Sequence, residues 1–114
     1  HQSYPEGYLV EVFTFNTLRY VYETFHDDLS KEHVTSQLRQ CPKRLKIGEF
    51  FATKNKHRPN WRLTIDYDDD LKLIKKIFSA LYKSNSFITY DSVFNYLKQH
   101  PSILEINQKY STKT

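Results

Sequence analysis

The stretch that decides the expected fold reads Arg62-Leu63-Thr64-Ile65-Asp66-Tyr67-Asp68-Asp69-Asp70-Leu71. A short β-prone run, 62–66, leads directly into an acidic cluster and then into apolar positions at helical spacing. Ligand and metal sites of α/β folds lie at the carboxyl ends of strands, so Asp66 is the leading functional candidate. The three aspartates at 68–70 have a structural reason instead, because carboxylates in a first helical turn satisfy free N–H groups and oppose the helix dipole.

Strand-like and helical patterns alternate along the rest of the chain. We expect strands at 8–14, 45–53 and 62–66. We expect helices that open at Asn16 or Thr17, at an N-cap Ser30, after the acidic cluster, at Thr89 or Asp91, and at Pro101. This mixture predicts an α/β layer, a few-stranded sheet with flanking helices. The 114 residues form a single domain or a fragment, with 110–114 as a frayed tail. Because three strands make a thin sheet and the chain starts at His1 rather than methionine, we expect a fragment of a longer domain.

Composition excludes several classes of site. With two glycines, the chain alone cannot supply a glycine-rich phosphate loop. A single cysteine, Cys41, gives no disulfide framework and no cysteine-based zinc site, which suits a reducing cytoplasm. No apolar run approaches the length of a membrane span, and no signal peptide is visible, so we expect a cytoplasmic protein without membrane association. No serine, cysteine or histidine arrangement indicates a nucleophile, and no catalytic residue is assigned.

The densest basic stretch is 54–62, in a chain of net charge +4 and pI near 9.1. Its cations could contact phosphates, with Trp61 available for stacking on a base. The stretch could equally be a polar loop between two strands. We favour the loop, because no recognition helix or RNA-binding aromatic motif accompanies it, and nucleic-acid binding is the least favoured function.

A series of short motifs along the chain resembles a known family. The motifs are Tyr4-Pro5-Glu6-Gly7, Glu11-Val12-Phe13, Glu32-His33-Val34-Thr35, Arg62-Leu63-Thr64-Ile65-Asp66 with Asp69-Asp70-Leu71, Phe87 with Asp91, and Pro101 with Ile106-Asn107. The series resembles the C-terminal half of the cytidylyltransferase-like family, in particular its spore-coat polysaccharide biosynthesis branch. That branch is related to acylneuraminate and deoxy-manno-octulosonate cytidylyltransferases. The resemblance implies the C-terminal half of a Rossmann-like nucleotidyltransferase fold of the glycosyltransferase-A type.

The resemblance also implies an activity. A sugar oxygen would attack the α-phosphate of CTP and release pyrophosphate, activating a sugar acid or related sugar for polysaccharide or glycoconjugate biosynthesis. Magnesium would be the cofactor of the complete domain, with Asp66 as a ligand, and the protein would form a homodimer. Glu11 would face the acceptor pocket, with His33 and Thr35 near it. His33 has an equal alternative as a hydrogen-bonded residue at a helix start.

Two departures from the family pattern count against a simple transfer of activity. The family often carries an aspartate two residues before Glu11, where this chain has Leu9. The N-terminal half, with its basic phosphate-binding loop, is also absent from the sequence. We therefore expect the parent protein to be the enzyme and this chain alone to lack competence. The alternative is a non-catalytic binding or oligomerisation module.

Overall fold

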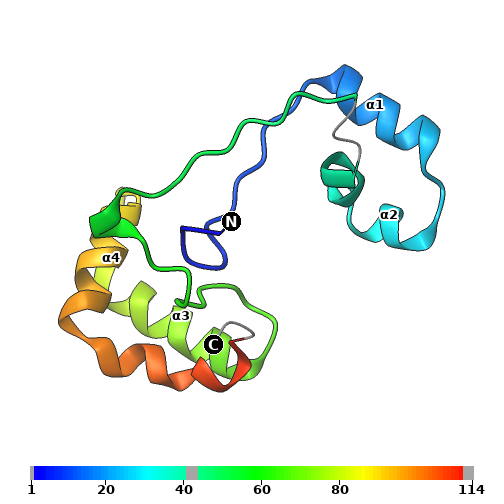
Figure 1. Cartoon of the computed structure of the whole chain (residues 1–114). Helices are drawn as coiled ribbons and strands as arrows, with labels where there is room; N and C mark the ends of the chain where they lie inside the picture. Colours follow the sequence, from blue (N-terminus) through cyan, green and yellow to red (C-terminus); the bar gives the residue numbers. More distant parts are fainter. Residues whose placement is uncertain (1, 41–43, 112–114) are drawn as a thin grey trace. The chain divides into compact units, whose positions relative to one another are not determined.

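A computed structural model describes residues 2–40 and 44–111 (Figure 1). The chain divides into two compact units: a smaller unit, Val10–Phe50, and a larger unit that combines His1–Leu9 with Phe51–Thr114. Helices are the regular elements of both units. Among the helices described, none is both long and apolar enough to cross a membrane.

The smaller unit consists of short helices. They are α1 (Phe15–Thr24), α2 (Asp28–Glu32) and the 3₁₀ helix η1 (Ser36–Gln40). The expected N-cap at Ser30 is wrong, since the cap of α2 is Asp27, whose Oδ1 accepts the Ser30 N–H at 2.9 Å. The carboxylate of an N-cap residue can accept a hydrogen bond from the free backbone N–H three residues later in the chain. The Ser30 hydroxyl instead donates to Asp27 Oδ2 at 2.6 Å, and both hydrogen bonds lower the pKa of Asp27.

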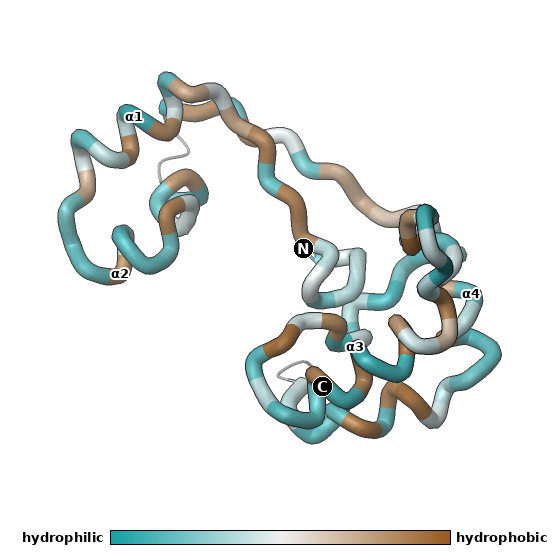
Figure 2. Tube along the Cα trace, turned by 180° about the vertical axis from the view of Figure 1, so that it is seen from behind, coloured by the Kyte–Doolittle hydropathy of each residue, from teal (hydrophilic) through white to brown (hydrophobic). Residues whose placement is uncertain are grey.

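The larger unit holds the hydrophobic core. Its helices are η2 (Lys54–Lys56), α3 (Asp68–Leu81), α4 (Tyr90–Gln99), η3 (Pro101–Ile106) and η4 (Gln108–Tyr110). The buried residues of the core cluster are Leu63, Leu73, Ile77, Val93 and Leu97. Along α3, hydrophobic and hydrophilic residues alternate as they do in a helix with one buried face (Figure 2). The N-cap of α4 is Thr89 and η3 begins at Pro101, and both were predicted.

The expected α/β architecture is wrong. Across residues 2–40 and 44–111 there is no sheet, and the β contact is one isolated parallel bridge between Glu6 and Arg62. Two backbone hydrogen bonds accompany it: the Glu6 N–H donates to Trp61 O at 2.9 Å, and the Leu63 N–H donates to Glu6 O at 2.8 Å. The structure is therefore a helical one, not half of a Rossmann-like, glycosyltransferase-A type sheet.

The reason lies in the hydrogen bonding that strands require. The β-prone segments 8–14 and 45–53 contain no strand, and most of their side chains are exposed: Val12 is 92% exposed and Phe50 is 96% exposed. β-Branched and aromatic residues fit a pleated, half-buried surface, but a strand forms only where a neighbouring strand pairs with it. Local composition alone therefore overstated the strand content.

A glycine turn makes the single bridge feasible. Gly7 has φ +99°, which L-residues rarely adopt, and a β-carbon at this position would collide with the backbone carbonyl of Leu63. This turn brings Glu6 beside Arg62. Near the C-terminus, Tyr110 stacks on Tyr67 with ring centroids 4.1 Å apart. Residues 112–114 of the expected tail lie outside the described residues.

Candidate functional site

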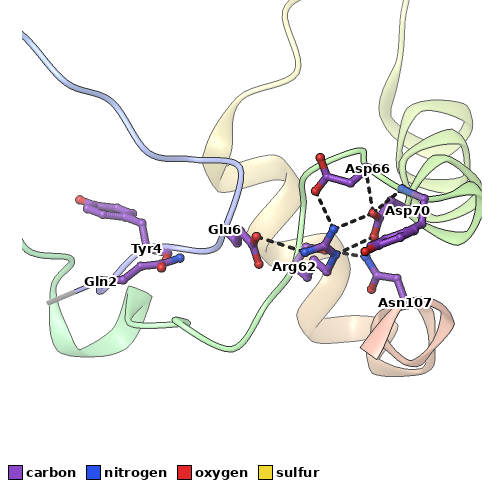
Figure 3. Close-up of polar contacts among 8 residues, drawn as sticks. Gln2, Tyr4, Glu6, Arg62, Asp66, Asp70 and Asn107 are labelled. Carbon is purple, nitrogen blue, oxygen red and sulfur yellow. Dashed lines mark hydrogen bonds and ion pairs between the residues drawn. The ribbon is translucent and has the colours of Figure 1, made fainter. Parts of the chain in front are cut away.

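Four segments of the larger unit meet at one buried cation, Arg62 (Figure 3). We call the group Glu6, Arg62, Asp66, Asp70 and Asn107 the Arg62 centre. The guanidinium, whose side chain is only 6% exposed, donates from Nη1 to Glu6 Oε1 at 3.1 Å and from Nη2 to Asp66 Oδ2 at 2.7 Å. Its Nε and Nη2 also donate to the two oxygens of Asp70, each at 2.9 Å. One positive charge is thus shared by three carboxylates.

Asp70 is the carboxylate of the centre with no exposed surface. Besides the Arg62 guanidinium, its oxygens accept the backbone N–H groups of Asp66 and Tyr67, each at 3.0 Å, and Asn107 Nδ2 at 2.7 Å. The hydrogen bonds from Arg62 are the main reason why the pKa of Asp70 lies well below its usual range, although burial opposes this. The same contact raises the pKa of Arg62. Because Asn107 Nδ2 also donates to Arg62 O at 3.0 Å, the centre joins backbone as well as side chains.

The acidic cluster at the start of α3 has the structural role predicted for it. Asp70 satisfies the free N–H of the N-cap residue Tyr67, as an acidic third residue of a helix does. Asp69 accepts from Lys109 Nζ at 2.8 Å and from Lys72 Nζ at 2.7 Å. These hydrogen bonds, led by the one from Lys109, lower the pKa of Asp69 to about 2.

The chain's own residues do not fit the magnesium site that Asp66 was expected to form. The Arg62 guanidinium lies between the carboxylates of Glu6, Asp66 and Asp70, where a metal ion would have to bind. It donates a hydrogen bond to Oδ2 of Asp66. A magnesium ion would have to compete with it or use the other Asp66 oxygen, on a side chain that is 59% exposed. In the part of the chain that the structure describes, no group of three or more His, Cys, Asp or Glu side chains could hold a metal.

Most of the basic side chains in the stretch 54–62 make contacts within the chain. Lys56 forms an ion pair with Asp91 at the start of α4, and Arg62 is buried in its own centre. Arg58 lies over the rings of Trp61 and Phe94, 5.6 and 5.1 Å from their centroids. The expected strand-to-strand loop is therefore a segment packed on α4, and its cations are partly neutralised or stacked.

The smaller unit contains a second site, which we call the Glu11 pocket. It is an open hollow of about 470 Å³. Its lining residues are Glu11, His33, Thr35, Ser36, Arg39 and Gln40. The three residues that the resemblance assigned to the acceptor side, Glu11, His33 and Thr35, therefore lie in one pocket although 24 positions separate the first from the last. Asp66 is not among the lining residues.

Local hydrogen bonds build the wall of this pocket. The His33 N–H donates to Leu29 O at 2.8 Å, which makes His33 the C-cap of α2 and rules out its alternative role at a helix start. The Ser36 N–H then donates to His33 O at 2.9 Å. The buried Gln37 Nε2 donates to Ser30 Oγ at 2.8 Å and so ties η1 to α2.

An ion pair joins two lining residues of the pocket, one on η1 and one in the segment before α1. Arg39 Nη2 donates to Glu11 Oε1 at 2.9 Å, and the Arg39 side chain is 73% exposed. Sequence reasoning missed Arg39, Ser36 and Gln40 as site residues. The sequence feature that could have identified them is the segment 35–40, which follows the end of α2 and is polar except for one residue. Arg62 was also missed, because it was assigned to the basic stretch.

Comparisons with known proteins give the chain one curated relative and no family assignment. The chain is 29% identical over 110 residues to an uncharacterized protein of Methanocaldococcus jannaschii, an alignment that covers 95% of this chain and 44% of the relative. It thus spans less than half the length of the relative it matches. No model of a known protein family matches the chain, and no solved structure matches it.

Proposed function

We propose that this chain is a segment of a sugar cytidylyltransferase-like protein that couples CTP to a sugar for polysaccharide or glycoconjugate biosynthesis, with the Glu11 pocket as its sugar-binding wall. One observation carries the proposal: Glu11, His33 and Thr35, selected by resemblance from separate motifs, line the same pocket. Its volume of about 470 Å³ falls within the range of about 300–1,000 Å³ that is usual for small-ligand pockets.

The pocket's side chains suit a sugar. The Glu11 carboxylate, the Thr35 hydroxyl and the Gln40 amide are acceptors or donors for hydroxyl groups. We assign them to binding and orienting the acceptor sugar, and we assign no catalytic residue. The length of the relative is compatible with further segments that would supply the CTP site. Magnesium belongs to the proposal only for that longer protein, because the Arg62 centre does not fit the ion.

We further propose a cytoplasmic location and a homodimer for the longer protein. CTP is a cytoplasmic substrate, and a single cysteine suits a reducing compartment. The homodimer rests on the resemblance alone. Size-exclusion chromatography with light scattering would test it, and a monomer across the micromolar range would exclude it.

The deciding test of the proposed function is pyrophosphate release. The longer protein, the isolated 114-residue chain and a Glu11→Ala variant of the longer protein would be assayed with CTP, magnesium and a panel of sugars. We expect release by the longer protein, none by the isolated chain and a raised KM for the sugar in the variant. Absence of release with every sugar, or a variant with unchanged KM, would remove the proposal.

A second candidate is a non-catalytic binding module of the same parent. The occupied Arg62 centre favours it, because the expected metal ligand Asp66 is already bound to a guanidinium. In that case the longer protein would bind sugar without releasing pyrophosphate from CTP. The third candidate, a nucleic-acid-binding domain, is supported least, since Lys56, Arg58 and Arg62 make internal contacts. Steep salt dependence of DNA or RNA binding would be its signature.

A further inference from the structure

Helix α3 carries more apolar surface than the core of the larger unit covers. Leu73 and Ile77 are buried in the core cluster. A second row of apolar side chains follows another side of the helix: Leu71, Phe78 and Tyr82 are seven and four positions apart and so share one helical face. We call these three residues the α3 row. All three are exposed, Phe78 by 51% and Tyr82 by 56%.

The apolar surface between the core and the α3 row is continuous. Ile74 lies three positions after Leu71 and four before Phe78, and it is partly buried against the core. Single exposed hydrophobic residues are common, whereas a connected apolar patch marks an interaction site. The Phe78 and Tyr82 rings stack with centroids 5.0 Å apart, so their positions are fixed before a partner arrives. Aromatic groups held in this way are typical anchors of interfaces.

A lysine on the same face indicates what kind of surface covers the α3 row. Lys75 is exposed and lies four positions after Leu71 and three before Phe78. If a second copy of the chain covered the row around a two-fold axis, the two Lys75 side chains would lie close together. Like charges that face each other across an interface disfavour association. The α3 row therefore fits a different surface, which is apolar and places a carboxylate opposite Lys75.

The length of the relative provides a source for such a surface. The alignment covers 95% of this chain and 44% of the M. jannaschii protein, so more than half of that protein has no counterpart in the 114 residues. A segment of the same polypeptide reaches an effective concentration on the order of millimolar, so a modest apolar contact suffices to hold it in place. A protein of the relative's length thus contains further chain that could cover α3.

We propose that the α3 row is the docking surface for the part of the longer protein that lies outside these 114 residues. That part meets the row with an apolar face and with a carboxylate opposite Lys75. The inference rests on the proposed function only for the longer protein itself, and it does not depend on CTP or on a sugar.

Hydroxyl-radical footprinting compares the exposure of side chains directly. The isolated chain and the longer protein would be oxidised under the same conditions, with circular dichroism to confirm that both are folded. We expect Phe78 and Tyr82 to react several times more slowly in the longer protein. Tyr22, an exposed ring of the smaller unit, would calibrate the reaction.

Substitutions in the longer protein test the same contact without the isolated chain. Lys75→Glu and Lys76→Glu make the same change of charge at exposed neighbours on one helix, but only Lys75 lies on the face of the α3 row. We expect Lys75→Glu to lower Tm by several degrees more than Lys76→Glu does. Phe78→Lys should lower Tm more in the longer protein than in the isolated chain, because the loss of ring stacking acts in both and the loss of docking in one.

Equal reactivity of Phe78 and Tyr82 in both proteins, or equal Tm values for Lys75→Glu and Lys76→Glu, would overturn the inference. A dimer of the longer protein that Phe78→Lys dissociates would also overturn it and assign the row to a second copy. Protected rings in a longer protein that releases no pyrophosphate would keep the inference and remove the proposed function. Pyrophosphate release with both rings exposed would do the reverse, and a gene that encodes no further chain would remove both.

Discussion

Asp70→Asn is the most informative single substitution for the structure. The change keeps the shape of a side chain with no exposed surface, but it removes the charge and turns one acceptor atom into a donor. If the new amide nitrogen replaces Oδ2, it faces three donors: Arg62 Nη2 and the backbone N–H groups of Asp66 and Tyr67. If it replaces Oδ1, it faces Arg62 Nε and Asn107 Nδ2. At least two hydrogen bonds are therefore lost in either orientation.

The magnitude follows from the burial of the pair. Removing one partner of a buried ion pair costs about 3–5 kcal/mol. We expect the lower end, about 3 kcal/mol, because Arg62 keeps Glu6 and Asp66, which are more exposed. For a domain of this size each kcal/mol lowers Tm by about 4–8 °C, so the midpoint should fall by roughly 12–24 °C.

Thermal unfolding followed by far-UV circular dichroism would measure the effect. Asp68→Asn is the matched control, because it makes the same chemical change in the same helical turn at an exposed side chain. We expect the control to shift Tm by only a few degrees. Equal midpoints for Asp70→Asn and Asp68→Asn would refute the placement of Asp70 as the buried acceptor of Arg62.

The same variant has a pH signature. The pKa of Asp70 is lower in the folded chain than in the unfolded chain, so the unfolded chain binds the proton more readily. The stability contributed by Asp70 is therefore complete above the ordinary aspartate pKa of 3.8 and is lost as the pH falls below it. Between pH values of about 5 and 2 the unaltered chain should lose more stability than Asp70→Asn does. Equal losses of stability by the unaltered chain and by Asp70→Asn over this pH range would contradict this account.

Three further substitutions test separate features. Lys109→Ala should raise the pKa of Asp69 from about 2 toward 3.8, since the hydrogen bond from Lys109 is the largest cause of the low pKa. NMR titration of the Asp69 carboxyl group would measure this change, and an unchanged pKa would show that the contact is absent. Gly7→Ala should destabilise the chain by about 1–3 kcal/mol, because it strains a positive φ and meets the Leu63 carbonyl; an unchanged urea midpoint would disprove the turn. Asp66→Asn should cost about 1 kcal/mol or less in stability, because its side chain is 59% exposed. An Asp66→Asn variant that lost as much stability as Asp70→Asn would contradict this peripheral role of Asp66.

The helices were largely accessible from sequence because their determinants are local. The acidic cluster at 68–70 predicted the start of α3, and Thr89 and Pro101 predicted the starts of α4 and η3. Helical hydrogen bonds and caps join residues three or four positions apart, so neighbouring side chains settle them. The error at Ser30 was of the same local kind, since Asp27 is the better-placed cap.

The sites depended on different information. Resemblance picked out Glu11, His33 and Thr35, but only the folded smaller unit added Arg39 and Ser36 to the same pocket. No periodicity marks these two residues as a site, because their significance comes from what lies across the pocket.

The Arg62 centre and the missing sheet show what tertiary structure alone decided. Arg62 was expected in a strand at the end of a basic loop and Asp66 at a metal. The fold instead joins them to Glu6, 56 positions from Arg62, and to Asn107, 45 positions from Arg62. Strand pairing has the same dependence, so β-prone segments stayed unpaired where no neighbour met them. Local sequence determines helices because their hydrogen bonds close within one turn. Buried charges and strands need partners from distant positions, and only folding brings those partners together.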